Sequence, residues 1–133
     1  MAGSQILNNN WVKVNNITFD LLEGSWKIKK GYGEKEFTPS IGEGGKINAN
    51  YVEKSSTKFS AGEFQIYNTP DNQTKFDTVM QQMKSNNGFG TISAYSTGFA
   101  YPPIVKAIIT NDPEWTGGTG GITISFAGEA VVE

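Results

Sequence analysis

Residues 64–84, FQIYNTPDNQTKFDTVMQQMK, decide the fold. The first four alternate apolar and polar, which is typical of a strand, and residues 70–84 place their apolar positions at the spacing of an amphipathic helix. These positions fall at i, i+3, i+4 and i+7 and are Phe76, Val79, Met80 and Met83. We expect the four side chains to anchor the helix on the rest of the fold, because an isolated helix of this length is marginal in water.

The ends of this helix can also be read from the sequence. Thr69 or Asp71 can accept hydrogen bonds from the free N–H groups of the first turn, and Pro70 suits the first helical position. At the other end, Lys84 complements the helix dipole and the turn NNG follows at 86–88. The pattern therefore predicts one helix with defined ends.

Outside the helix, apolar and polar residues alternate, which is typical of half-buried strands. Asn15 and Asn16 form a turn that tolerates positive φ. We expect strands at 11–14, 17–21, 26–29, 47–52, 57–67, 90–95, 104–109 and 121–127, and a short last piece at 129–132. The sequence predicts a mainly β single domain over 1–133, a small β-barrel or sandwich with one flanking amphipathic α-helix and a flexible N-terminus at 1–10.

One expected hairpin joins the strands within 47–67 through a polar turn at 53–56. The apolar phase changes across Gly62, and a glycine inside a strand often marks a β-bulge. We therefore expect the second strand of this hairpin to be long and bent, and to lead directly into the helix.

Residues 31–46 contain five glycines, one proline and little periodicity, and we expect a long loop there. Loops of this length in a compact domain are functional or become ordered on binding. Tyr32, Phe37 and Ile41 are too apolar for an idle loop. We expect contact with something outside the segment to order it.

The composition argues against most catalytic chemistry. With no cysteine and no histidine, the chain lacks the usual thiol nucleophile, general base and zinc ligands. Its glycine-rich stretches do not match phosphate-binding loops. The carboxylate pairs Glu34 with Glu36 and Asp112 with Glu114 lie in expected loops, where solvated charge is the ordinary interpretation. We expect no enzymatic function, no catalytic residues, no cofactor and no metal.

The charges argue against specific nucleic-acid binding. All eleven basic residues are lysines, arginine is absent, and the net charge is −2. The bidentate donor that reads guanine edges is therefore missing, and so is the basic footprint of non-specific DNA binders. No stretch approaches the roughly 20 apolar residues of a membrane span, and the N-terminus lacks a secretory signal. We expect no membrane partner and synthesis in the cytoplasm.

The aromatic residues leave one alternative function open. Trp11, Trp26 and Trp115 could form a platform on which sugar rings stack, as in a carbohydrate-binding β-sandwich module. The other interpretation is that Trp26 belongs to the core and Trp115 anchors a loop. Aromatic residues fit the pleated surface of strands in any case, so their number does not decide between the two.

The order of these elements resembles the tail tube proteins of contractile-tailed bacteriophages and their relatives in type VI secretion systems and phage-like particles. The resemblance rests on the early meander, the glycine-rich loop at 31–45, the hairpin at 47–67, the corner NTPDN at 68–72, the helix to residue 84 and the closing strands to residue 132. It covers nearly the whole chain from Trp11 onward and depends on pattern and length.

The resemblance implies a structural virion protein of the phage tail. In that family, six subunits close into a ring, and stacked rings form a tube that conducts DNA during ejection. The implied partners are other copies of the chain, the tail sheath, baseplate and tail terminator proteins, and DNA that passes without specific binding. Tyr32, Phe37 and Ile41 would then lie against an adjacent subunit or ring.

Overall fold

The computed structural model describes residues 10–118 and 120–132. Nearly all of the expected flexible N-terminus, 1–10, lies outside the described residues. In chain order the elements are β1 (Trp11–Val14), β2 (Ile17–Thr18), β3 (Leu21–Lys29), β4 (Glu34–Ile41), the 3-10 turn η1 (Glu43–Gly45), β5 (Ile47–Lys54), the 3-10 turn η2 (Ser55–Thr57), β6 (Ser60–Tyr67), α2 (Pro70–Ser85), β7 (Gly90–Ser96), β8 (Phe99–Ile109) and β9 (Gly121–Gly128).

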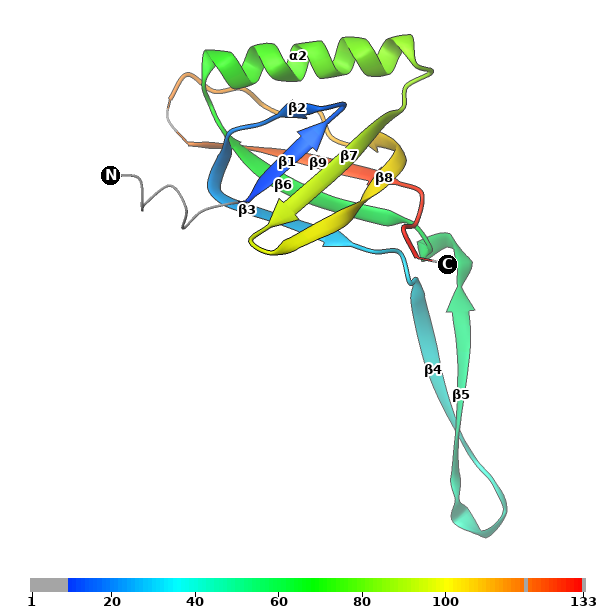
Figure 1. The fold of residues 1–133 in the computed structure, drawn as a ribbon. Coiled ribbons are helices and arrows are strands. Elements are labelled where there is room, and N and C mark those ends of the chain that lie inside the picture. Colours follow the sequence, from blue (N-terminus) through cyan, green and yellow to red (C-terminus); the bar gives the residue numbers. More distant parts are fainter. Residues whose placement is uncertain (1–9, 119, 133) are drawn as a thin grey trace.

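Seven strands form one curled antiparallel sheet in the order β2-β1-β7-β8-β9-β6-β3. The sheet curls into a half-barrel, and α2 lies across one side of it (Figure 1). Across the curl, the indole N–H of Trp26 on the end strand β3 donates to the carbonyl of Tyr95 on β7, the third strand from the other end, at 3.0 Å. The prediction of a mainly β, barrel-like domain with one flanking helix is confirmed.

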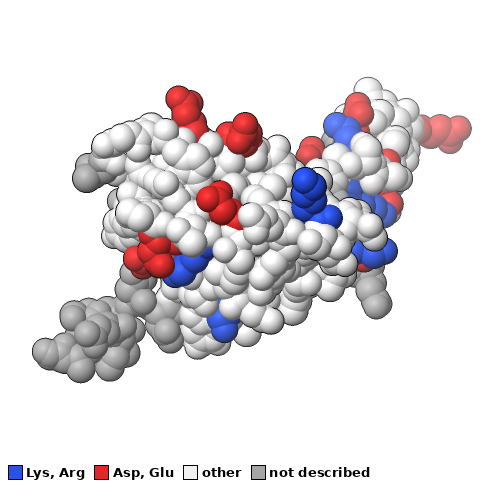
Figure 2. Space-filling model, turned by 90° about the horizontal axis from the view of Figure 1, so that it is seen from above, with Lys and Arg blue, Asp and Glu red and all other residues white. Residues whose placement is uncertain are grey.

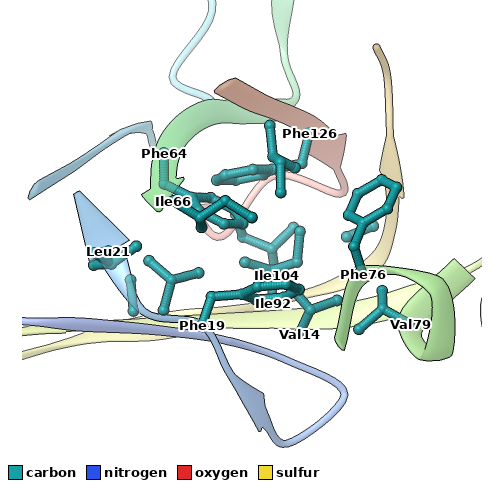
Figure 3. Packing of buried hydrophobic residues seen from close by; sticks show 14 of the residues in the cluster. Val14, Phe19, Leu21, Phe64, Ile66, Phe76, Val79, Ile92, Ile104 and Phe126 are labelled. Atoms are coloured by element: carbon teal, nitrogen blue, oxygen red, sulfur yellow. The ribbon is translucent and has the colours of Figure 1, made fainter. Parts of the chain in front are cut away.

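The core lies inside the curl of the sheet, beneath the helix. Phe76 and Val79 of α2 reach the same interior as Ile92 of β7 and Ile104 of β8 (Figure 3). On the opposite wall, Phe64 of β6 packs against Phe126 of β9 with ring centroids 5.9 Å apart. The fully buried side chains include Val12, Val14, Ile66, Ile92, Ile104 and Ile124. In β1, β7 and β9 the buried residues come from alternate positions, as expected for half-buried strands, whereas in β8 they are three residues apart.

The helix starts as predicted and ends one residue later, at Ser85. Of the two candidate caps, Thr69 is the one whose side chain accepts from the N–H of Asn72, at 3.2 Å. Three of the predicted anchors, Phe76, Val79 and Met83, are buried.

The prediction that Met80 is a fourth anchor is wrong, because this residue is 39% exposed. The buried face of α2 runs through Asn72, Phe76, Val79 and Met83, spaced four, three and four residues apart. At about 100° per residue, Met80 lies at the flank of this face. The buried face therefore contains the polar Asn72 in place of Met80.

Asn72 is fully buried and fixes the start of the helix to the sheet. Its amide group accepts from the backbone N–H of Asp20 at 3.2 Å and donates to the Asp20 carbonyl at 3.1 Å. It also donates to the Tyr67 carbonyl at 2.9 Å. One side chain thus satisfies three backbone groups, two in the connection between β2 and β3 and one at the end of β6, and these hydrogen bonds offset the cost of burying the amide.

The predicted asparagine turn is present, whereas the predicted glycine bulge is not. The turn at Asn15 and Asn16 is confirmed, with φ of 52° and 69°. The β-bulge at Gly62 is wrong, because the pairing of β6 with β9 runs through it without a shift. A Cβ at Gly62 would collide with the carbonyl oxygen of Lys27, so this glycine permits close approach of β3. The register shift lies in β3, between Leu21 and Trp26.

The long loop predicted at 31–46 is wrong, and so is the hairpin within 47–67. Residues 34–41 form β4, which pairs along its whole length with β5, and β6 lies between β3 and β9. The predicted turn at 53–56 became the end of β5 and η2, and the chain there passes from one sheet to another. Periodicity locates strands but does not identify their partners, which are set by long-range contacts.

A smaller difference concerns β8. The loop expected before residue 104 belongs to the strand, which begins at Phe99. The pairing with β7 shifts twice, so that Pro102 and Pro103 sit at an irregularity of the ladder. Bulges are positions where a strand accepts proline without losing a required hydrogen bond.

Candidate functional site: a projecting arm

The strands β4 and β5 form a two-stranded arm, residues 34–54, that projects away from the body on the side opposite α2 (Figure 1). Pairing is regular from Glu34 with Lys54 at the root to Ile41 with Ile47 at the tip. Every residue of the two strands is exposed. Eight residues per strand extend about 26 Å at 3.3 Å per residue, so the tip lies far from the body.

The two faces of the arm differ sharply in chemistry. Directly paired residues share a face, and the face alternates along each strand. One face, called the apolar face here, carries Phe37, Pro39, Ile41, Ile47, Ala49 and Tyr51, and near the root it also carries the charged pair Lys35 and Glu53. The opposite face carries Glu34, Glu36, Thr38, Ser40, Asn48, Asn50 and Lys54, with Val52 as its apolar member. The arm is therefore an amphipathic hairpin.

Within residues 10–118 and 120–132, nothing covers the apolar side chains of this face. Phe37 is 62%, Ile41 80%, Ile47 71% and Tyr51 63% exposed. An isolated two-stranded hairpin is marginally stable in water, and contiguous exposed apolar patches of this kind mark interaction sites. The arm thus has the exposed apolar surface that is typical of a protein-binding site.

The root of the arm is held by Thr57, which is hydrogen-bonded to both strands, and the chain enters it through two glycines. The hydroxyl of Thr57 accepts from the Glu34 N–H and donates to the Lys54 carbonyl, both at 2.6 Å. On the β4 side, Gly31 and Gly33 have φ of 100° and 83°, a region that favours glycine. Two left-handed residues so close together turn the chain sharply out of the body.

An exposed ion pair borders the root. The ammonium group of Lys58 lies 2.8 Å from Glu53, and its hydrogen bond and positive charge lower the pKa of that carboxyl group below its ordinary value. Because both side chains are exposed, the pair contributes little to stability.

The three predicted interface residues fall in two places. Phe37 and Ile41 share the apolar face of the arm. Tyr32 precedes β4 and lies at the root, where it is 65% exposed and lines a hollow of about 360 Å³ together with Phe59. Their role at an interface stays a prediction.

Sequence reasoning missed four of the six apolar residues on this face. Ile47, Ala49 and Tyr51 were assigned to a strand of the body, and Pro39 was taken as a loop residue. A signal was present: the alternation FTPSI at 37–41 resumes as INANY at 47–51 across the turn GEGGK. Two such runs around a short glycine-rich turn are typical of a hairpin.

The charged residues show no concentrated field on the side that carries the helix. In the view from that side, acidic and basic side chains are scattered over body and arm (Figure 2). The candidate carboxylates Glu34, Glu36, Asp112 and Glu114 are all exposed. Within residues 10–118 and 120–132, no group of three or more acidic side chains could hold a metal ion.

The tryptophans are engaged within the subunit. Trp11 stacks on Tyr95 with centroids 5.4 Å apart, and the Lys13 ammonium lies 4.5 Å from its ring. Trp115 packs edge-on against Phe76. Trp26 is half-buried and packs on the core. These contacts follow the interpretation of Trp26 as core and Trp115 as an anchor.

Comparisons of the chain with protein-family models, with curated proteins and with solved structures find no match. Among the described residues, no helix is long and apolar enough to cross a membrane.

Proposed function

We propose that this chain is a structural, non-enzymatic virion protein that self-assembles into stacked hexameric rings, forming the inner tail tube of a contractile phage tail. One observation carries the proposal: a well-formed body presents a regular amphipathic arm whose apolar face is uncovered. Copies of one chain can cover such arms repeatedly, since a contact between two different surfaces extends into rings or filaments.

The area of the arm supports an interface between proteins. Its two aromatic and two isoleucine side chains, with Pro39 and Ala49, expose on the order of 500–600 Å², approaching the roughly 800 Å² per partner of a standard interface. A small ligand would need a concave site, whereas the arm is a convex, extended surface. A protein partner therefore fits the arm better than a small molecule.

The two edges of the open sheet offer a second surface for contacts between subunits. Its end strands, β2 and β3, form the two edges of the sheet, so each has one ladder partner within the described chain. Exposed edges invite pairing with other strands, and ring closure would use them. Six copies would thereby bring their half-barrels together around a common channel.

The charge of the chain suits a conduit. A tube lined by arginine would hold DNA phosphates, whereas this chain has no arginine and a net charge of −2. DNA would pass without specific binding. Sheath, baseplate and tail terminator proteins would be the other partners, in the tail of a virion whose proteins are made in the host cytoplasm.

Negative-stain electron microscopy of the purified chain tests the proposal. We expect rings or hollow tubes, at a frequency that rises with protein concentration. Monomers at every concentration would contradict it. Monomers that bind a polysaccharide would support the carbohydrate-binding module instead, although the tryptophan rings are engaged by the chain's own residues.

A further inference from the structure

The chain leaves α2 through a tight turn at residues 86–88. The N–H of Gly88 donates to the carbonyl of Met83 at 2.7 Å, and the N–H of Asn86 donates to the same carbonyl at 3.0 Å. Asn87 and Gly88 have φ of 58° and 90°, the left-handed region in which helices commonly end. The end of the helix thus places an asparagine directly before a glycine.

This pair of residues carries the groups of a spontaneous deamidation. Asparagine is among the thermolabile residues, and Asn87 is the one asparagine of the chain that a glycine follows. The backbone nitrogen of Gly88 attacks the side-chain amide carbon of Asn87, and the bond from that carbon to the amide nitrogen breaks. Ammonia leaves with the proton that the attacking nitrogen gives up, and a succinimide ring remains. One water molecule then opens the ring to aspartate or isoaspartate.

The surroundings leave both reacting groups open to water. Asn87 is exposed, and no hydrogen bond within residues 10–118 and 120–132 holds its side chain. A Cβ built on Gly88 would meet nothing within 4 Å, so the nitrogen of that residue is sterically unhindered. The restraint on the reaction is the hydrogen bond from Gly88 to Met83, because the attacking nitrogen has to lose the proton that this bond holds.

We propose that Asn87 is a deamidation site that the last turn of α2 holds in check, and that it reacts when this turn opens. Helix ends open locally far more often than the whole domain unfolds. The rate of deamidation is then the fraction of time that the turn is open, multiplied by the rate in a free chain. This inference is independent of the proposed function.

Deamidation would change a junction between three elements. It adds a carboxylate at the negative end of the helix dipole, and isoaspartate also lengthens the backbone of the turn that leads into β7. The start of β7 is fastened to the β1–β2 turn, since the N–H of Asn15 donates to the Thr91 carbonyl at 2.9 Å and the N–H of Thr91 donates to Asn15 Oδ1 at 3.0 Å. We therefore expect the modified chain to melt at a lower temperature.

Incubation of the full chain in mildly alkaline buffer tests the proposal. Mass spectrometry of its peptides, with isoaspartate separated by chromatography, measures the rate at each asparagine. A synthetic peptide of residues 84–91 gives the rate without the helix. We expect Asn87 to react before any other asparagine, and at least about tenfold more slowly in the folded chain than in the peptide.

Two matched variants test whether the last turn controls the rate. Gln82→Gly weakens the end of the helix at an exposed position and should speed deamidation of Asn87 at least about threefold. Thr74→Gly places the same substitution near the other end, also at an exposed position, and should leave the rate unchanged. Asn87→Gly keeps a residue that tolerates positive φ but lacks the reactive amide, so its melting temperature should not fall during incubation.

Each alternative result overturns a stated part of the proposal. Earlier reaction of another asparagine would overturn the assignment of the site. Equal rates in the folded chain and the peptide would show that the hydrogen bond to Met83 is no restraint. Equal acceleration by Gln82→Gly and Thr74→Gly would place the reaction in the unfolded chain and overturn control by the last turn. None of these rates depends on whether the chain forms rings or tubes, so the proposed function and this inference fail separately.

Discussion

In β6 of the body, Phe64 and Ile66 alternate with polar residues and are buried in a shared core, whereas Ile47 and Tyr51 alternate in the same way on β5 of the arm and are exposed. The local pattern is the same in both strands. The difference lies in what faces them: β6 lies between two strands and beneath α2, and β5 has one partner. Alternation therefore marks a face that needs a partner, without saying whether the same chain provides it.

The difference predicts two kinds of substitution effect. A change in the body should alter the free energy of unfolding of the subunit, because its apolar groups are already covered. A change on the apolar face of the arm should leave the folded subunit intact and alter association.

The largest effect is expected on α2, where the buried Val79 is followed directly by the exposed Met80. Val79→Asp places an unpaired carboxylate in the core and should lower the free energy of unfolding by more than about 4 kcal/mol. Met80→Asp is the matched variant, and its exposed position should limit the loss to about 1 kcal/mol. Urea denaturation measures both. Equal losses would contradict the assignment of Met80 to the flank of the helix.

Asn72→Ala should have the next largest effect. It removes the partner of the Asp20 N–H, the Asp20 carbonyl and the Tyr67 carbonyl, and it should cost about 2–4 kcal/mol. Thr74→Ala on the exposed side of α2 is the control and should change stability by less than about 0.5 kcal/mol. If the two variants unfold at the same urea concentration, the amide of Asn72 does not join helix and sheet.

Phe37→Asp should impair assembly and leave the stability of the subunit almost unchanged. Because the side chain is exposed in the subunit, the free energy of unfolding should change by less than about 0.5 kcal/mol, while polymerisation is lost. Thr38→Asp adds the same charge one residue away on the polar face and should polymerise normally. Light scattering measures assembly and urea denaturation measures stability. Unimpaired polymerisation of Phe37→Asp would argue against any role of the arm in assembly.

The parts of the fold that the sequence predicts are those with local causes. The start of α2 follows from Thr69 and Pro70, and the Asn15–Asn16 turn follows from the tolerance of asparagine for positive φ. Met80 was misassigned because the apolar stripe was read from side-chain type alone, and Asn72 was overlooked because its partners at Asp20 and Tyr67 are set by the tertiary fold.

The candidate site was only partly predictable. Phe37 and Ile41 were identified by being too apolar for a loop, but glycines at both ends of β4 hid the strand that carries them. Their partners Tyr51 and Ile47 depended on register, which no single run of residues determines. The hollow at the root brings together residues from before β4 and after β5, and only the structure reveals that they are neighbours.

The smallest effect is expected at the ion pair beside the root. Since Lys58 lowers the pKa of Glu53, the interaction is fully present above the ordinary value of 4.5 and is lost as pH falls through the lowered value. Lys58→Met should raise the pKa of Glu53 toward its ordinary value, leaving the weaker attraction of Lys35, without a measurable change in melting temperature, because both members of the ion pair are exposed. Lys54→Met is the control, since Lys54 forms no ion pair among the described residues, and it should leave that pKa lowered. An NMR titration of the Glu53 carboxyl carbon measures the pKa, and a pKa that is as low in Lys58→Met as in the unmodified chain would place the main cause elsewhere on the arm.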